Sequence, residues 1–532
     1  MADLLPVRLV QFNPLVGDID GNRARIEARL KSQRQPSIWV FPELALCGYP
    51  PEDLLLRDDF IGRVDRALGK LARRSEEHWI IVGAPVREGG ALFNAACVLH
   101  QGRRVGFACK RLLPHYDVFD EQRYFAPGSE PYVIAAGRRI GLLICEDLWQ
   151  PEPAADLAAA GAEILVCLNA SPFDLRKASR RLEVARARAL ETGCPVWYVN
   201  QVGGQDELVF DGASFVLDAS GQRTLQLPSF VEAEAELVPE GSGWSSSRQE
   251  IKDLDEDATL YQALVLGVRD YVNKHHAPGA LVGLSGGIDS ALTLVIAADA
   301  LGPERLEAVL MPSRYTSQAS GEDAALLCER LGVPVLELSI EPAFRALLKT
   351  LGPEAEQDDL VCQNLQARIR GLLLMARSNH SGKLLLTTGN KSELAVGYAT
   401  LYGDMAGGFA PLKDIFKTRV YQLARYRNQD GEIIPERVLT RPPSAELKAD
   451  QKDSDSLPDY AVLDAVLRLF VEEDCSLPEI VAQGFDADLV HDVVARVLGS
   501  EYKRRQAPPG VKTTERAFGR DRRYPITSGY KA

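Results

Sequence analysis

Apolar and polar positions follow one pattern in the first part of the chain. Short apolar runs that predict β-strands alternate with stretches of helical periodicity, and hairpin-like segments follow around residues 211–226. The strand-like runs are VRLVQF, SIWVF, WIIVGAPV, RRIGLLIC, AEILVCL and PVWYVN. This order predicts an α/β region in which stacked sheets are covered by helices.

The pattern changes in the second part of the chain. Apolar runs without alternation are each followed by a helical pattern; they are Leu281–Leu284, Glu307–Met311, Val335–Ile340 and Leu384–Thr388. Runs of this kind are typical of parallel strands that are buried on both faces. They predict an open, doubly wound sheet, whose ligands are expected at the carboxyl ends of its strands.

A break in composition separates the two patterns. Residues 239–258, PEGSGWSSSRQEIKDLDEDA, are rich in Ser, Gly and acidic residues and have no apolar periodicity. The chain of 532 residues is also too long for one hydrophobic core. We therefore expect a first domain over residues 1–238, a linker over 239–258 and a second domain over 259–532.

Composition excludes some classes of protein. The apolar share of 46% and the charged share of 25% are ordinary for a soluble protein, and no run approaches the ~20 apolar residues that span a bilayer. A net charge of −13 disfavours general nucleic-acid binding. The start of the chain has no basic leader, and its nine cysteines include no CxxC pair. These features predict a cytoplasmic protein with reduced thiols.

Residues 284–293, LSGGIDSALT, read as a loop between a buried strand and a helix. Gly286 and Gly287 allow the backbone to approach an oxyanion, while Ser285 and Ser290 supply hydroxyl donors at a helix N-terminus. The loop lacks the lysine of an ordinary P-loop, which points to pyrophosphate release instead of γ-phosphate transfer. The alternative is a glycine-rich turn that only connects strand and helix.

Two carboxylates are candidates for binding Mg²⁺ at this sheet edge. Asp289 would repel phosphates unless a divalent cation lay between them, and Glu393 follows the strand LLLTTG at the same edge. Glu393 has an equally good alternative role, in which it complements the dipole of a helix capped by Asn390 or Ser392.

Glu43, Lys110 and Cys145 each follow a predicted strand in the first domain. A thiolate can attack an amide carbon, a carboxylate can take the thiol proton and later activate water, and an ammonium can stabilise the tetrahedral oxyanion. For any single cysteine, a small buried hydrophobe is the more common role. The three residues together favour catalysis.

This set, in this order, resembles the nitrilase superfamily of carbon–nitrogen hydrolases over residues 5–235. The resemblance implies an αββα sandwich in which Glu43 is the general base, Lys110 the oxyanion stabiliser and Cys145 the nucleophile. Glu146 would support the site or form a structural salt bridge.

Three motifs in the first domain, LPHYDVFDEQRYF, ICEDLW and NASPF, resemble the glutaminase domains of glutamine-dependent NAD synthetases. The match implies that Tyr116, Ser171 and Lys177 bind glutamine. His115 replaces an asparagine of the usual wording, and a surface position is the simplest explanation.

Motifs in the second domain resemble NAD synthetase domains over most of residues 260–530; they are LSGGIDS, QNLQARIRG, TTGNKSELAVGYATLYGD and SAELKADQKDSDSLPDYAVLD. The first alone would equally suit argininosuccinate, GMP or asparagine synthetases. The resemblance implies an adenine nucleotide alpha hydrolase-like, Rossmann-like fold. The residues implied to bind ATP are Gly283, Leu284, Ser285, Gly286, Gly287, Ile288, Asp289, Ser290 and Thr388. Those implied to bind deamido-NAD are Asn364, Glu393, Tyr398, Ala399, Thr400, Leu401 and Lys503.

The tail over residues 503–523 is basic in a chain that is acidic overall. A solvated surface and a nucleic-acid patch are the alternatives, but both implied substrates carry phosphates, and nothing in the tail requires DNA or RNA. We expect Lys503, and also Lys512, to reach those phosphates.

Together the resemblances imply a ligase that uses ATP and Mg²⁺ to adenylate the nicotinate carboxylate of deamido-NAD. Glutamine hydrolysis at Cys145 would supply ammonia through an internal passage, and the family implies a homo-oligomer. The alternatives are an amidotransferase that acts on a different acid, and a binding or sensor protein without turnover. The intact Glu43, Lys110, Cys145 and Asp289 disfavour the sensor.

Overall fold

The computed structural model of the chain describes residues 4–241, 243–246, 253–357 and 359–530. The chain divides into two compact units, Met1–Leu254 and Asp255–Ala532, called unit 1 and unit 2 below. Each unit is described by itself.

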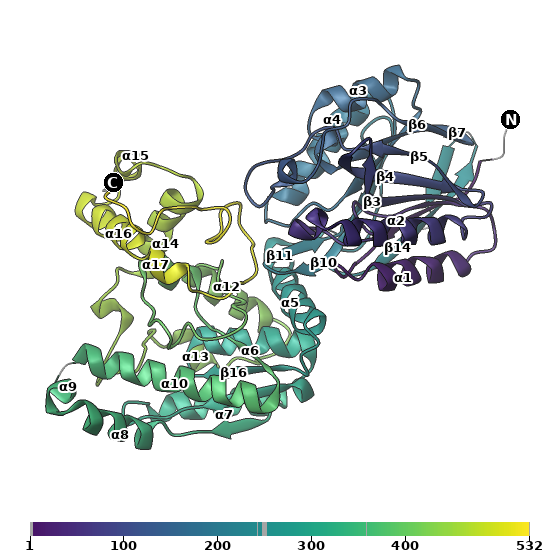
Figure 1. The fold of residues 1–532 in the computed structure, drawn as a ribbon. Helices are drawn as coiled ribbons and strands as arrows, with labels where there is room; N and C mark the ends of the chain where they lie inside the picture. The colour runs from purple at the N-terminus through teal and green to yellow at the C-terminus, as the bar shows by residue number, and fades with distance from the viewer. Residues whose placement is uncertain (1–3, 242, 247–252, 358, 531–532) are drawn as a thin grey trace. The chain divides into compact units, whose positions relative to one another are not determined.

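Unit 1 is built on two large sheets in its described residues (Figure 1). The first has the strand order β15-β14-β1-β2-β3-β4-β5 and the second the order β13-β12-β9-β8-β7-β6. The strands of the first sheet are β1 (Val7–Gln11), β2 (Ile38–Val40), β3 (Trp79–Glu88), β4 (Ala91–His100), β5 (Arg103–Cys109), β14 (Ala233–Glu240) and β15 (Gly243–Ser246). Those of the second are β6 (Val133–Ala136), β7 (Arg138–Ile144), β8 (Ile164–Asn169), β9 (Val196–Asn200), β12 (Phe215–Leu217) and β13 (Arg223–Gln226). A separate hairpin consists of β10 (Val202–Gln205) and β11 (Leu208–Asp211).

Alternation along the strands explains how the sheets pack. In β1, Leu9 lies in a core shared with Ile140 and Val166 of the second sheet, whereas Val10 lies in a different core with Ile26 of a helix. Helices α1 (Ile19–Lys31) and α2 (Asp58–Ala72) cover the outer face of the first sheet, and α3 (Pro151–Ala159) and α4 (Lys177–Thr192) cover that of the second. Unit 1 is thus an αββα sandwich, as predicted.

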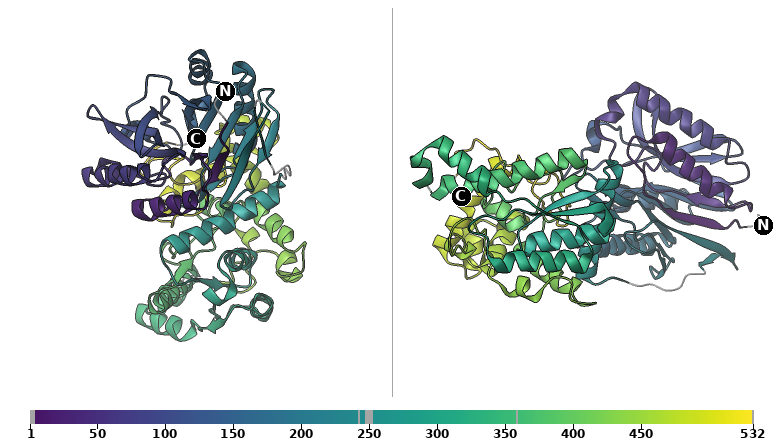
Figure 2. Two further views of the ribbon diagram at one scale, coloured as in Figure 1. Left: turned by 90° about the vertical axis from the view of Figure 1, so that its right-hand side faces the viewer. Right: turned by 90° about the horizontal axis from the view of Figure 1, so that it is seen from below.

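Unit 2 contains a parallel sheet with the order β18-β17-β16-β19 (Figures 1 and 2). Its strands are β16 (Ala280–Leu284), β17 (Leu306–Leu310), β18 (Val335–Glu337) and β19 (Leu384–Leu386). The chain runs from β16 outwards through β17 to β18 and then returns to place β19 on the other side of β16. The reversal of strand order between β16 and β19 is the position where doubly wound sheets bind ligands. This confirms the predicted fold class.

Helices cover both faces of the sheet in unit 2 (Figure 2). Leu281 and Val309 pack against Phe344 of α8 (Glu341–Leu351) and Ile369 of α10 (Asp359–Ser381). On the other face α6 contacts β16, and α5 and α12 pack against α6. The other helices of eight or more residues in unit 2 are α5 (Glu256–Lys274), α6 (Ile288–Leu301), α7 (Gln318–Leu331), α12 (Lys417–Arg427), α14 (Tyr460–Leu467) and α16 (Ala487–Gly499). Shorter helices are α9 (Pro353–Gln357), α11 (Lys391–Val396), α13 (Glu436–Thr440), α15 (Leu477–Ala482) and α17 (Glu501–Arg504).

The segment expected as a linker, residues 239–258, is partly regular structure. It includes the end of β14, the whole of β15, which pairs with β14, and the start of α5, where the Asp255 carboxylate accepts a hydrogen bond from Ala258 N at 2.7 Å. Residues 242 and 247–252 of this segment lie outside the described residues. The composition of this segment did not predict β15, because β15 is formed by backbone pairing with β14.

Candidate active sites

Unit 1 brings Glu43, Lys110 and Cys145 together, as the sequence predicts. Glu43 follows β2, Lys110 follows β5 and Cys145 follows β7, and all three side chains are buried. Lys110 Nζ lies 2.8 Å from Glu43 Oε1. Cys145 is close enough for both charges to act on its thiol. Three strands that are distant in sequence therefore end at one site.

A fourth polar residue, Glu121, belongs to this site. Its Oε1 accepts hydrogen bonds from Lys110 Nζ at 2.7 Å and from Tyr49 OH at 2.9 Å. Glu121 lies inside the quoted motif LPHYDVFDEQRYF, but nothing in the sequence assigned it a role. The available signal in the sequence was that Glu121 is an acidic residue in a motif that follows Lys110.

Backbone and side-chain donors hold the Glu43 carboxylate in place. Asn94 Nδ2 donates to Glu43 Oε1 at 2.7 Å, and Ala170 N donates to Glu43 Oε2 at 2.9 Å. Asn94 belongs to β4, a strand that the sequence did not identify. The orientation of Glu43 is therefore fixed from both of its oxygens.

The electrostatics of the site keep the lysine charged and the thiol protonated at rest. Burial by itself lowers the pKa of Lys110, but Glu121 and Glu43 outweigh burial and hold this pKa well above its usual value. Burial raises the pKa of the Cys145 thiol, Glu43 raises it further, and Lys110 offsets only part of the increase. Cys145 thus requires a base to become a thiolate, and the Glu43 side chain lies at that site.

The turn that carries Cys145 has an unusual backbone. Cys145 has φ +46°, in the left-handed region, where β7 passes into the 3₁₀ helix η3 (Cys145–Leu148). The buried Asp147 carboxylate accepts hydrogen bonds from Ile144 N at 3.1 Å, Arg111 N at 2.9 Å and Leu112 N at 2.8 Å. One carboxylate thereby ties the cysteine turn to the segment that follows Lys110.

The residues expected to bind glutamine are arranged less uniformly. Tyr116 is about half exposed, and its hydroxyl donates to Glu146 Oε2 at 2.9 Å, so Glu146 supports Tyr116. Ser171 is buried directly after Ala170, whose N–H binds Glu43. Lys177 Nζ lies 5.1 Å from the Trp149 ring centroid. The replaced position, His115, is exposed, with Nδ1 3.0 Å from Asp120 Oδ1.

Unit 2 contains a cavity of about 340 Å³ at the carboxyl ends of β16 and β19. Among its lining residues are the predicted ATP residues Gly283, Leu284, Ser285, Gly286, Gly287, Ile288, Asp289 and Thr388. Ser290 is buried below the loop, and its Oγ contacts Ser285 Oγ at 3.0 Å. Gly286 has φ +80°, and a Cβ there would meet Ser320 O at 2.5 Å, so the loop requires glycine at this position.

Asp289 and Glu393 both line this cavity and are joined by Lys417. Lys417 Nζ is bonded to Asp289 Oδ2 and lies 3.0 Å from Glu393 Oε1. Burial raises the pKa of Glu393 to about 7; Lys417 opposes the increase and Asp289 adds to it. The sequence analysis missed Lys417, which stands in the segment LKDIFKTRV without any motif that marks it.

Glu393 lies both at a helix N-terminus and at the cavity. Asn390, and not Ser392, caps α11, because its Oδ1 accepts from Glu393 N at 3.0 Å, so Glu393 does lie in the first turn of a helix. Its carboxylate nevertheless faces the cavity and pairs with Lys417. A position at the helix N-terminus and a position in the candidate site are therefore compatible.

The residues expected to bind deamido-NAD do not all line the cavity. Tyr398 and Thr400 line the cavity, and Thr400 Oγ1 donates to Asn364 Oδ1 at 3.0 Å. Ala399 and Leu401 are the flanking residues, and the Leu401 carbonyl accepts from an arginine of α10 at 3.2 Å.

The two tail lysines use their ammonium groups within unit 2. Lys503 Nζ donates to Gly397 O at 2.7 Å and to Ala399 O at 2.8 Å and is not among the residues that line the cavity. Lys512 is buried and donates to Thr514 O, Glu515 O and Asp521 Oδ2. The expectation that Lys512 reaches phosphate is corrected, because three acceptors of its own segment use its three hydrogens.

Comparisons with known proteins place these sites in a family. The family model for carbon-nitrogen hydrolase matches residues 6–239, and that for NAD synthase matches residues 260–507. The chain is 45% identical over 536 residues to the glutamine-dependent NAD(+) synthetase of Acinetobacter baylyi, covering 99% of this chain and 98% of that one. It is 47% identical over 543 residues to that of Xanthomonas campestris, with the same coverage.

Solved structures agree with this placement. A glutamine-dependent NAD+ synthetase from Acinetobacter baumannii in complex with ADP aligns with a TM-score of 0.79 at 42% identity, covering 98% of each chain. One from Cytophaga hutchinsonii shares the fold with a TM-score of 0.84 at 21% identity, covering 99% of this chain and 98% of that one. The chain therefore belongs to the family of glutamine-dependent NAD(+) synthetases.

Proposed function

We propose that the protein converts deamido-NAD to NAD at the expense of ATP, with nitrogen from glutamine. The observation that carries the proposal is that one chain holds both sites: a buried thiol beside a lysine–carboxylate pair in unit 1, and a pyrophosphate-type loop at a cavity in unit 2. Its relatives match both units over nearly their whole length.

In unit 1, Cys145 is the nucleophile. Glu43 takes the thiol proton as sulfur attacks the glutamine amide carbon, and the Lys110 ammonium stabilises the oxyanion. The C–N bond breaks, ammonia leaves with a proton returned by Glu43, and a thioester remains. Glu43 then activates water, and hydrolysis releases glutamate. Tyr116, Ser171 and Lys177 are proposed to hold the glutamine.

In unit 2, the loop over residues 285–290 binds the ATP phosphates at the N-terminus of α6. The nicotinate carboxylate attacks the α-phosphorus, the bond between the α-phosphorus and its bridging oxygen breaks, and pyrophosphate leaves. Ammonia then attacks the acyl carbon and displaces AMP. Lys417 offers a fixed positive charge beside the departing phosphates, and Tyr398 and Thr400 contact deamido-NAD.

Mg²⁺ is part of the proposal as the ion that accompanies ATP. Asp289 and Glu393 offer carboxylate oxygens, the ligands that Mg²⁺ prefers. In the part of the chain that the structure describes, no three His, Cys, Asp or Glu residues are grouped as a metal site, so phosphate oxygens would supply other ligands. When bound, Mg²⁺ neutralises charge on the leaving group.

Ammonia must reach the adenylate unprotonated, because ammonium is not a nucleophile. We propose that an internal passage carries it.

We also propose that the protein works in the cytoplasm as a homo-oligomer. Leu360, Leu372 and Met375 of α10 are exposed apolar side chains, and they offer unit 2 an apolar surface for a second copy. No helix among the described residues has the length and apolar character needed to cross a bilayer.

Two variants test the division of labour. Cys145→Ala should lose NAD formation from glutamine by a factor on the order of 10⁴ or more, while formation from ammonium chloride stays within about twofold of the parent. Asp289→Ala should lose NAD formation from either nitrogen source while glutamate release continues.

The assay measures NAD from deamido-NAD and ATP, and glutamate release in parallel. Loss of the ammonium-driven reaction in Cys145→Ala would contradict separate sites. Turnover of another acid in place of deamido-NAD would replace the proposed substrate while leaving the two-site chemistry intact.

A further inference from the structure

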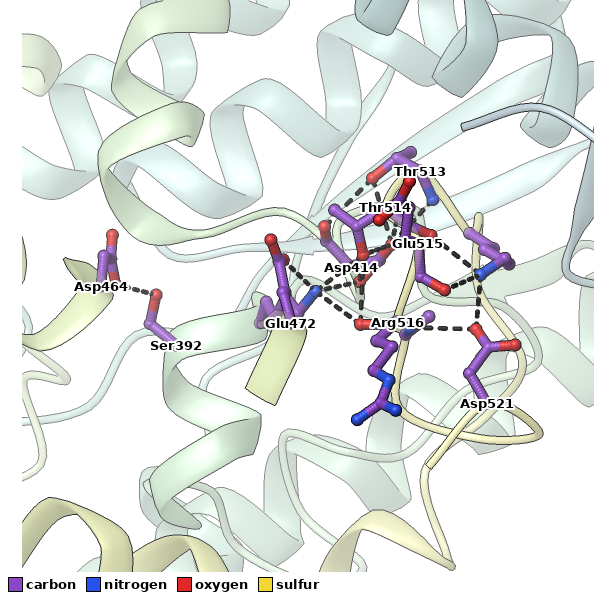
Figure 3. A network of polar contacts seen from close by, with 12 residues as sticks. Ser392, Asp414, Asp464, Glu472, Thr513, Thr514, Glu515, Arg516 and Asp521 are labelled. Carbon is purple, nitrogen blue, oxygen red and sulfur yellow. Dashed lines mark hydrogen bonds and ion pairs between the residues drawn. The ribbon is translucent and has the colours of Figure 1, made fainter. Parts of the chain in front are cut away.

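Next to the cavity of unit 2, Lys391, a buried lysine that the proposed reaction does not use, is the centre of a polar network. Figure 3 shows Asp414, Glu472, Thr514 and Arg516 of this network. The Lys391 side chain has no exposed area. Its Nζ contacts Asp414 Oδ1 at 2.6 Å, Glu472 Oε1 at 2.5 Å, Thr514 Oγ1 at 2.9 Å and Arg516 O at 3.0 Å. Lys391 comes two residues before Glu393, so the network adjoins a candidate site residue.

The network fixes the C-terminal segment Thr513–Asp521, called the tail segment below. Asp414 Oδ2 accepts hydrogen bonds from Thr513 N at 2.7 Å and from Thr514 N at 2.8 Å, and Asp414 Oδ1 accepts from Thr514 Oγ1 at 3.0 Å. Burial by itself raises the pKa of Asp414, but Lys391 outweighs burial and lowers it, so both groups are charged. A buried, charged junction of this kind holds its members rigidly.

The residues on either side of Lys391 are also fixed, each from a different direction. Asn390 Nδ2 donates to Asp289 Oδ1 at 2.9 Å while its Oδ1 caps Glu393 N. Ser392 Oγ donates to Asp464 Oδ1 at 2.5 Å (Figure 3). Each residue of the turn 390–393 thus contacts a different part of unit 2.

Asp414 and Lys417 connect the tail segment to the cavity a second time. They stand three residues apart on the segment that enters α12, and Lys417 N donates to Ser392 Oγ at 2.8 Å. Lys417 Nζ then binds both Asp289 and Glu393. A shift of Asp414 would therefore move the turn and the lysine that faces it.

We propose that the tail segment is a positioning element for adenylation: through Lys391 and Asp414 it fixes the turn 390–393 and sets the Glu393 carboxylate against Asp289. The inference rests on the proposed function for the meaning of the Glu393 position. It extends that function by giving the C-terminal segment, which contributes no side chain to the lining of the cavity among its described residues, a part in the reaction.

Thr514 is the best position for a test. Removing Lys391 would take the ammonium group away from Asp414, which is buried, and from Glu472, whose side chain is 18% exposed, and would disrupt unit 2. Thr514→Val keeps the shape of the side chain but removes the hydroxyl that accepts from Lys391 and donates to Asp414, whereas Thr514→Ser keeps the hydroxyl. Lys413→Met is the matched control, since Lys413 Nζ donates to Pro508 O, at 2.7 Å, a residue outside the tail segment.

Two measurements are made on the full chain. Hydrogen–deuterium exchange of the peptide over residues 388–397, without ligands, should be about tenfold faster in Thr514→Val than in the parent. The KM for ATP at saturating Mg²⁺ in the ammonium-driven reaction should also increase about tenfold, with glutamine hydrolysis unchanged. Thr514→Ser and Lys413→Met should match the parent in both.

Unchanged exchange in Thr514→Val would overturn the positioning role, as would an equal increase in Lys413→Met, which would indicate a general effect of the tail. If the parent forms no NAD, the proposed function fails by itself, and the exchange experiment still decides whether the tail segment fixes the turn.

Discussion

The two units each hold a lysine between two carboxylates, but the surroundings of these lysines differ. Lys110 of unit 1 lies between Glu43 and Glu121, whose side chains are 0% and 6% exposed. Lys417 of unit 2 lies between Asp289 and Glu393, whose side chains are 16% and 17% exposed at the cavity.

The difference in exposure matches the proposed chemistry. The buried charges of unit 1 stay in one arrangement, which suits the hydrolysis of one small amide through a covalent intermediate. Carboxylates that reach a cavity can change partners when a polyphosphate and its cation enter. Similar residues thus give a fixed site in unit 1 and an adaptable one in unit 2, and four changes test this contrast.

The largest effect is expected for Lys110→Met. The variant leaves Glu43 and Glu121 buried without a cation, so unit 1 should lose about 3–5 kcal/mol of its free energy of unfolding. Glutamine hydrolysis should become undetectable. All five tryptophans lie in unit 1, so urea unfolding followed by tryptophan fluorescence measures this unit alone. If the free energy of unfolding of unit 1 decreased by less than about 1 kcal/mol, the proposed difference between the two lysine sites would be contradicted.

Lys417→Met should be milder for folding and specific in activity. Its carboxylates can be solvated from the cavity, so the stability of unit 2 should fall by less than that of unit 1 in the previous variant. NAD formation from glutamine and from ammonium should each decrease by about 10²–10³-fold, the cost of removing a fixed charge near a transition state. Glutamate release should continue, and its loss would argue against separate roles.

The pH dependence of unit 2 should contain a contribution from Glu393. Its pKa is about 7 in the folded protein, raised by burial against the effect of Lys417, and 4.5 is its ordinary value. Between these values the folded form binds more protons than the unfolded form, so the free energy of unfolding falls as pH rises from about 4.5 to about 7.

The raised pKa of Glu393 changes the free energy of unfolding by about 3 kcal/mol over this range. The stabilisation is fully present below pH 4.5. Glu393→Gln should abolish it. The measurement is urea unfolding followed by circular dichroism at pH 5 and pH 7.5, with the unit 1 transition identified by tryptophan fluorescence. A parent and variant with the same pH dependence would contradict the raised pKa of Glu393.

The smallest effect is expected for Tyr116→Phe. Tyr116 is half exposed and loses one hydrogen bond to Glu146, so the KM for glutamine should increase about threefold to tenfold with little change in kcat. The ammonium-driven reaction is the control and should be unaffected. A large fall in kcat would instead place Tyr116 among the reacting groups.

Glu43, Lys110, Cys145 and the loop over residues 285–290 were predicted as site residues, but partners that complete each site were not predicted. Glu121 accepts a hydrogen bond from Lys110, Asn94 donates one to Glu43, and Lys417 joins Asp289 to Glu393. The residues that were found occur in motifs with fixed spacing. Glu121 lies in a motif that did not assign it a role, and Asn94 and Lys417 come from a strand and a segment without a motif. Only folding brings them into contact with the predicted residues.

The basic tail over residues 503–523 is a second region in which the sequence did not predict the contacts of charged side chains. Its basic composition suggested phosphate contacts for Lys503 and Lys512, yet their hydrogens are donated to carbonyls and to Asp521. Composition reports how many charges a segment carries. It does not report which acceptors lie within reach after packing.

The sequence by itself determined the two layer architectures, because strand periodicity and unbroken apolar runs reflect how many faces of each sheet are buried. It also determined the loop of unit 2, whose glycines and serines are local requirements. Only the tertiary structure decided how the charges are paired: Lys110 with Glu43 and Glu121, Lys417 with Asp289 and Glu393, and Lys391 with Asp414 and Glu472. Pairing depends on distances of a few ångströms between segments far apart in the chain, and local pattern carries no record of those distances.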